Sequence, residues 1–77
     1  MSISTTQVKA ARALLGWSRI KLSLESEILH GAITEFENGQ RTLSSDAIGA
    51  VRHAFESAGV TFVRENGDGS DVRLGAK

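Results

Sequence analysis

The sequence predicts a mainly α-helical domain of four to five helices that ends in a short pair of β-strands or a hairpin. Up to Gly59, apolar residues recur at intervals of three and four, and most of these stretches are bounded by residues that cap helices. After Gly59 the apolar residues alternate instead, as they do in strands. The 77 residues contain no proline and no cysteine and are 40% hydrophobic, which favours an ordered domain without disulfides.

The first helix is predicted to follow Ser4. Ser4 and Gln7 match the capping-box pattern, in which each side chain accepts a hydrogen bond from the other residue's backbone. Gly16 is a suitable C-terminal stop for this helix. The apolar residues that share one face of it are Val8, Ala11 and Leu15.

Two short helices are predicted next, close together in the chain. Ser18 is expected to cap a helix over about 19–26, and a further helix should cover about 30–37 before Gly39 ends it. The residues expected to point inward from these two helices are Leu22, Ile33 and Phe36.

A fourth, longer helix is predicted to begin after Ser44 or Ser45, with Asp46 in its first turn, and to end at Gly59. Its apolar stripe consists of Ala47, Ile48, Val51, Phe55 and Ala58.

Two short strands are expected in residues 60–77, separated by the turn cluster ENGDGS. A lone two-stranded ribbon is marginal in water and its free edge can pair with another chain. The preferred interpretation is therefore a dimer joined partly through these strands, and the alternative is a hairpin folded back on its own helices. The residues expected to dimerise are Val60, Phe62, Val63, Val72 and Leu74.

The charges are balanced in number but sorted along the chain. Nine basic residues offset nine acidic ones, whereas nucleic-acid-binding domains tend to be basic. Residues 25–37 hold four glutamates and no lysine or arginine. By contrast, the first 24 residues contain no acid and four basic residues, namely Lys9, Arg12, Arg19 and Lys21. The sign of the charge on each surface therefore matters more than the total.

Several other classes of protein are not expected. His30 and His53 fall on separate predicted helices without a cysteine nearby, so neither a zinc site nor another metal or cofactor is predicted. No nucleophile motif suggests an enzyme. The segment NGDGSD is too short for a calcium loop. Because the sequence has no signal-peptide pattern and no long apolar run, a cytoplasmic location without membrane contact is expected.

The stretch QVKAARALLGWSRIKLSLESEILHGAITEFENGQRT resembles the phage-repressor and Cro-like (Xre-type) helix-turn-helix family, over roughly 5–55. The GWS junction and the EFENGQ ending of the third helix fall into the family register without a gap. The tail AGVTFVRENGDGSDVRL looks like the extension of one group of short bacterial members. The individual matching positions are Val8, Arg12, Leu15, Leu22, Ile28 and Ile33.

The resemblance implies that the third helix lies in the DNA major groove while the preceding helix straddles the backbone. Residues implied to contact phosphate are Ser18, Arg19, Asn38, Gln40 and Arg41. Residues implied to face base edges are His30, Gly31, Thr34 and Glu35, with Ala32 on the same side. The family also often pairs a first-helix arginine with a third-helix glutamate, which here would be Arg12 and Glu37.

Three residues depart from the family pattern. Glu27 stands where a glycine usually adopts a left-handed backbone, and Leu29 stands where a serine or threonine usually caps the third helix. Gly31 replaces a long polar side chain at a base-reading position. Whether the third helix can contact bases therefore depends on the conformation of this turn and on the orientation that the turn gives to the helix.

Two functions remain open from the sequence. The first is a sequence-specific transcriptional regulator with residues 1–59 as its DNA-binding domain and 60–77 as its dimerising extension. It would bind an inverted-repeat operator as a homodimer, control its own gene, and block RNA polymerase or contact it when suitably placed. The second is a protein-interaction module such as an antiactivator that masks another regulator. Ile20 and Leu24, four residues apart on the second helix, would form its contact patch. The alternative is that they belong to a slightly enlarged core or are scattered exposed apolar residues.

Overall fold

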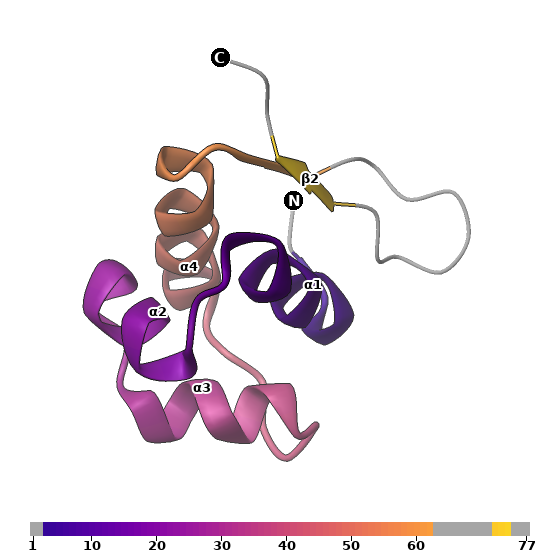
Figure 1. The fold of residues 1–77 in the computed structure, drawn as a ribbon. Coiled ribbons are helices and arrows are strands. Elements are labelled where there is room, and N and C mark those ends of the chain that lie inside the picture. The colour runs from indigo at the N-terminus through magenta and orange to yellow at the C-terminus, as the bar shows by residue number, and fades with distance from the viewer. Residues whose placement is uncertain (1–2, 63–71, 75–77) are drawn as a thin grey trace.

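The computed structural model describes residues 3–62 and 72–74, which form four helices and two short strands (Figure 1). The elements in chain order are α1 (Thr5–Leu15), α2 (Arg19–Ser26), α3 (His30–Glu37), α4 (Ser45–Ser57), β1 (Val60–Phe62) and β2 (Val72–Leu74). The prediction of a mainly helical domain with a C-terminal strand pair is confirmed.

Serine side chains begin three of the four helices. The hydroxyl oxygens of Ser4, Ser18 and Ser44 each accept a hydrogen bond from the backbone N–H three residues later, at 3.0–3.1 Å. At α1 the capping box is complete, because the side-chain oxygen of Gln7 accepts from the backbone N–H of Ser4 at 2.9 Å. Of the two serines considered for α4, Ser44 is the cap. These local rules fix where the helices start.

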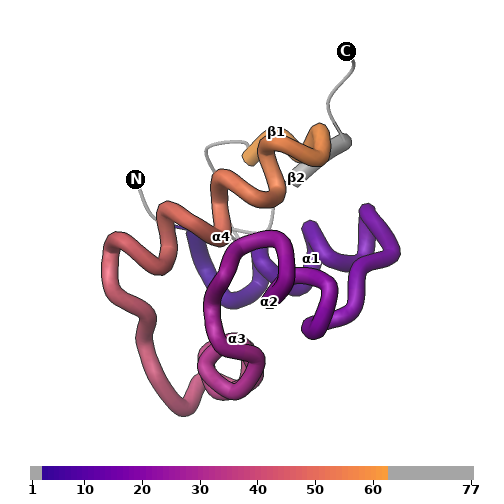
Figure 2. Tube along the Cα trace, turned by 90° about the vertical axis from the view of Figure 1, so that its left-hand side faces the viewer, coloured from indigo at the N-terminus to yellow at the C-terminus, as the bar shows by residue number. Residues whose placement is uncertain are grey.

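The α3 helix lies at one end of the molecule, and the two strands lie at the other end. Figure 1 shows α3 lying across the lower end, and Figure 2, turned by 90°, shows the same helix almost along its axis at that end. The α2 helix packs against both α3 and α4, while α1 packs against α3 and β2. The α4 helix continues into β1, which also contacts it.

Phe55 of α4 is the centre of the core and is fully buried. The Trp17 ring stacks on it with the ring centres 5.6 Å apart, and the Phe62 ring meets it edge-on at 5.9 Å. Ala58 was expected in this core but is exposed because α4 ends at Ser57. The buried apolar residues are Ile3, Val8, Ala11, Leu22, Ile33, Phe36, Ile48, Val51, Ala54, Phe55, Val60 and Phe62.

The two strands pair with each other in antiparallel fashion within the chain. Val60 lies opposite Leu74, Thr61 opposite Arg73, and Phe62 opposite Val72. The alternative of a hairpin folded on its own helices is therefore the arrangement in this structure.

This pairing bears on the expected role of two strand residues. Val60 and Phe62 are 3% and 7% exposed and their side chains belong to the chain's own core, so a second chain would meet the backbone edge of β1 and not these side chains. Val63 and the predicted turn at 65–70 lie outside the described residues, as do the side chains of Val72 and Leu74. A dimer formed along the strand edges remains a prediction.

Candidate functional site

Glu37 is the centre of an ion-pair cluster beneath α3. Its side chain is 0% exposed, and both carboxylate oxygens accept hydrogen bonds from Arg12 of α1. The Nε and Nη2 groups of Arg12 each lie 2.7 Å from one oxygen, which is the bidentate arrangement that arginine and carboxylate prefer. The remaining Arg12 Nη1 donates to the backbone carbonyl of Trp17 at 3.0 Å. The implied pair of Arg12 and Glu37 is thus present, and it ties α1 to α3.

Arg19 also contacts this carboxylate, which the sequence did not indicate. Its Nε donates to Glu37 Oε1 at 3.0 Å, so the first residue of α2 is joined to the last residue of α3. The Arg19 side chain is 37% exposed, whereas that of Arg12 is 19% exposed. Three helices therefore meet at one buried carboxylate.

The environment of Glu37 acts on its pKa in two directions. Burial of the carboxylate raises the pKa, because a charge is disfavoured away from water. The hydrogen bonds and positive charges of Arg12 and Arg19 together outweigh burial and hold the pKa of Glu37 below its usual value of 4.5. Glu37 is therefore a stable anion at neutral pH.

The turn between α2 and α3 has the left-handed backbone that the family resemblance implied at Glu27. Glu27 adopts the left-handed conformation, with a φ of 63°, and is the one non-glycine residue in the described chain with positive φ. Leu29 precedes α3 and makes no side-chain capping hydrogen bond to the described residues. The first turn of α3 thus keeps backbone N–H groups that its preceding side chain does not satisfy.

Two serines of α2 stabilise this turn, a role that the sequence did not predict. The hydroxyl of Ser23 donates to the carbonyl of Ile28 at 2.5 Å. The hydroxyl of Ser26 donates to the carbonyl of Leu22 at 2.7 Å and accepts from the backbone N–H of Ile28 at 3.3 Å. The only signal in the sequence was a pair of serines near a helix end, where such side chains often bond to nearby backbone groups.

The outer face of α3 carries some, but not all, of the expected base-reading groups. His30, Gly31 and Glu35 are exposed, and Ala32 is half-buried. A Cβ atom added at Gly31 would meet no described atom within 4 Å beyond its chain neighbours and the backbone of its own helix. Thr34 differs from the expectation, since its hydroxyl oxygen is buried and has no hydrogen-bond partner within the described part of the chain. Its exposed area therefore belongs to other atoms of the residue.

The expected phosphate-contacting residues beyond α3 lie at the surface. Asn38, Gln40 and Arg41 are all exposed. Arg41 Nη1 donates to Glu35 Oε1 at 3.2 Å, and the two side chains are 50% and 53% exposed. Such an exposed pair is worth less than about 1 kcal/mol, so either partner can exchange it for another contact.

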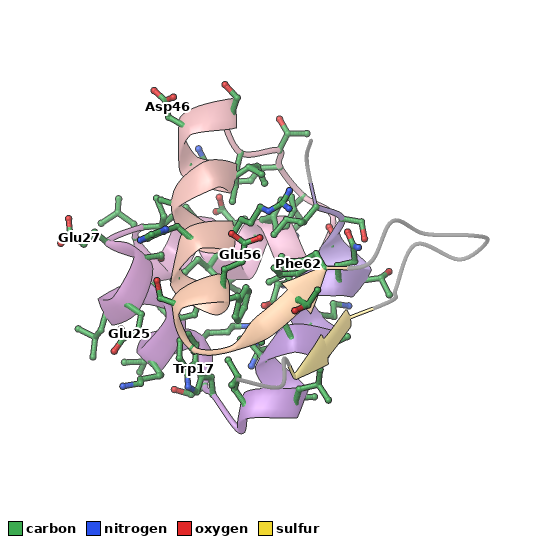
Figure 3. The ribbon with its side chains drawn as sticks, turned by 90° about the horizontal axis from the view of Figure 1, so that it is seen from above. Trp17, Glu25, Glu27, Asp46, Glu56 and Phe62 are labelled. Atoms are coloured by element: carbon green, nitrogen blue, oxygen red, sulfur yellow. The ribbon has the colours of Figure 1, made fainter. Side chains whose placement is uncertain are left out.

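An open groove lies beside the start of α3. It has a volume of about 350 Å³ and runs between the α2–α3 turn and the segment that leads to α4. Its lining combines apolar residues with Glu27 and Arg41. In Figure 3, Glu27 points away from the body of the molecule, as do Glu25 and Asp46. The complete lining is Glu27, Ile28, Leu29, Ala32, Arg41, Thr42, Leu43, Ser44 and Ala47.

Large apolar side chains are exposed along α2 and the following turn. Ile20 is 60% exposed, Leu24 is 73% exposed and Leu29 is 79% exposed. Ile20 and Leu24 are therefore exposed and do not enlarge the core. Ile20 and Leu24 stand one helical turn apart and share a face of α2.

The described residues contain no group of three or more His, Cys, Asp or Glu side chains arranged to hold a metal ion. In the same part of the chain, every helix is too short or too polar to cross a membrane. Neither the models of known protein families nor the curated proteins include a match to this sequence.

Proposed function

We propose that this protein is a sequence-specific DNA-binding transcriptional regulator that inserts α3 into the major groove. The observation that carries the proposal is the position of α3 at one end of the molecule, with His30, Gly31 and Glu35 exposed on it (Figure 1). The resemblance of residues 5–55 to the phage-repressor and Cro-like family supports the same role for this helix. A helix of this kind reads base edges, while the residues around it bind the backbone.

The polar and charged residues around α3 are suited to phosphate contacts. Asn38, Gln40 and Arg41 follow the C-terminal end of α3, while Ser18 caps α2 and Arg19 is its first residue. When Arg41 binds a phosphate it releases Glu35, whose carboxylate can then accept a hydrogen bond from cytosine N4. Two exposed groups that pair with each other in the free protein would thus exchange that contact for two contacts with DNA.

The protein is proposed to act as a homodimer on an inverted repeat with half-sites about 34 Å apart, and to repress its own promoter. The dimer would form along the edges of β1 and β2. Sedimentation of the purified chain over a range of concentrations tests this part, with the expected mass rising to that of two chains. A constant single-chain mass would contradict it.

The function is tested by titrating the purified protein against DNA from upstream of its own gene, at two salt concentrations, with random DNA as competitor. We expect tight binding that survives the competitor. Arg41→Ala should weaken binding to all sequences, since it removes a phosphate contact. Lys9→Ala is the matched control, because it removes the same charge from an exposed position of α1 outside the proposed interface. Binding that the competitor abolishes would overturn sequence-specific recognition.

A second candidate function is a protein-interaction module that masks another regulator. The exposure of Ile20, Leu24 and Leu29 favours it, since exposed apolar side chains that cluster often mark protein contacts. The net charge of +0 also favours it. The same titration separates the two functions, because such a module would show no competitor-resistant DNA binding.

A further inference from the structure

Arg19 uses only part of its guanidinium group inside the protein. Its Nε donates to Glu37, and no described residue accepts a hydrogen bond from its two Nη groups. In Arg12, by contrast, all three guanidinium nitrogens donate a hydrogen bond, from Nε, Nη1 and Nη2. The side chain of Arg19 is also about twice as exposed as that of Arg12, at 37% against 19%.

We propose that Glu37 is a positioning residue that holds Arg19 so that its two Nη groups bind one DNA phosphate. This inference rests on the proposed function. A free arginine side chain loses rotamer entropy when it is fixed. Because the Nε contact with Glu37 already fixes the guanidinium in the free protein, less of this loss remains when a phosphate binds.

The charges of the cluster agree with this role. Arg12 covers both oxygens of the buried carboxylate, so its charge offsets that of Glu37. The cluster of two arginines and one glutamate therefore keeps one net positive charge, and Arg19 carries it at the more exposed position. A phosphate next to Arg19 would also lie near the N-terminal end of α2, where the helix dipole favours an anion.

The same contact sets the geometry between two parts of the interface. Arg19 is the first residue of α2 and Glu37 is the last residue of α3. A single buried carboxylate thus fixes the phosphate-binding arginine relative to the helix that reads the bases. An arginine is needed here, since lysine has neither the Nε–H nor the planar fork.

A double-mutant cycle of DNA affinity tests the inference. The proteins are wild type, Glu37→Gln, Arg19→Ala and the double variant. The probe is a short duplex of random sequence at low salt, because phosphate contacts do not depend on sequence. Arg19→Ala should weaken binding by roughly tenfold, as expected for a charge-assisted hydrogen bond. Glu37→Gln should weaken binding severalfold in the wild-type background and have almost no further effect in the Arg19→Ala background.

Two opposite results would overturn the inference. Equal losses from Glu37→Gln in both backgrounds would mean that Glu37 acts only through Arg12 and the general fold. A gain in affinity from Glu37→Gln would mean that the carboxylate restrains Arg19 from DNA. Circular dichroism at the temperature of the titration verifies that each variant is folded.

Two further measurements keep the inference separate from the proposed function. Arg19→Lys keeps the charge and should still bind several times more weakly than wild type, so wild-type affinity in this variant would contradict the inference. Hydrogen exchange of the Arg19 Nε–H, followed by NMR without DNA, should be slow in wild type and fast in Glu37→Gln. If wild type binds no duplex at all, the proposed function fails and the inference fails with it. If it binds but the cycle is additive, only the inference fails.

Discussion

At the scale of single residues, Glu37 shows why the position of a charge matters more than its presence. It is one of four glutamates between 25 and 37, a segment whose acidity would by itself disfavour contact with DNA. Because its side chain is fully buried against two arginines, it contributes no negative charge to the outer face of α3. Glu35 is the remaining carboxylate on that helix, and it is exposed.

Glu37 should make the stability of the protein depend on acid pH. Its pKa in the folded state lies below 4.5, so its stabilising effect is complete above that pH and is lost as the pH falls through the lower, folded-state pKa. Replacing Glu37 by Gln should cost about 2 kcal/mol at neutral pH, less than for a wholly buried pair because both arginines are partly exposed. Denaturant unfolding at several pH values measures both effects. If Glu37→Gln lost as much stability in acid as wild type does, Glu37 would not be the source of this pH dependence.

Glu35 is expected to influence which base is preferred. Glu35→Gln should change the preference at one base pair per half-site, since a carboxylate only accepts hydrogen bonds whereas an amide also donates them. Selection of bound sequences from a randomised operator measures the preference. Glu25→Gln, on α2, is the matched control and should leave the preference unchanged. A preference profile that is identical for wild type and Glu35→Gln would refute the reading role.

At the scale of elements, two residues of the α2–α3 connection are of types that its backbone conformation disfavours. Glu27 is left-handed without being glycine, and Leu29 begins α3 without a capping oxygen. Ser23 and Ser26 compensate by bonding to the backbone at Ile28 and Leu22. The turn is thus held by side chains of the preceding helix.

Replacing Glu27 by glycine should stabilise the protein by about 0.5–1 kcal/mol, because glycine adopts a left-handed backbone without a steric penalty. Thermal unfolding measures the change. Glu27→Ala is the control, since it removes the same charge but keeps the strained backbone, and it should give no gain. If both variants were equally stabilised, relief of charge repulsion and not of backbone strain would be the cause.

At the scale of the whole molecule, the C-terminal strands complete the helical core. Val60 and Phe62 of β1 are buried, and the Phe62 ring contacts that of Phe55. The α1 helix contacts β2, so the two ends of the described chain are packed together. A chain shortened at Gly59 would therefore lose core residues as well as strands. A change in its self-association could then result from lost stability, so this truncation would not test dimerisation.

Phe62→Ala should destabilise the protein by about 3 kcal/mol, because it leaves a cavity against Phe55. Urea unfolding followed by circular dichroism of the helices measures this. Thr61→Ala is the neighbouring control on the exposed side of β1 and should cost far less. Similar effects of the two substitutions would mean that the hairpin is not part of the cooperative core.

The helix boundaries were predictable because they depend on neighbours in the sequence. A capping serine acts within three residues, and Ser18 starts α2 in this way. The predicted ranges for α2 and α3 are those of the structure, although α3 begins without a capping side chain. The same local reasoning failed for Ala58, since the apolar spacing continues past the residue where α4 ends. Ile3 was missed because it precedes the first helix and belongs to no periodic pattern.

The sequence by itself determined the helical class and the three serine-capped helix starts, and its family resemblance implied the left-handed position at Glu27 and the pair of Arg12 and Glu37. Only the tertiary structure decided that Arg19 shares the same carboxylate, that the Thr34 hydroxyl is buried, and that β1 faces the chain's own core. The physical reason is distance along the chain. A helix cap is formed by residues that are close together in the sequence. The contact between Arg19 and Glu37, which are 18 residues apart, depends instead on how the helices pack.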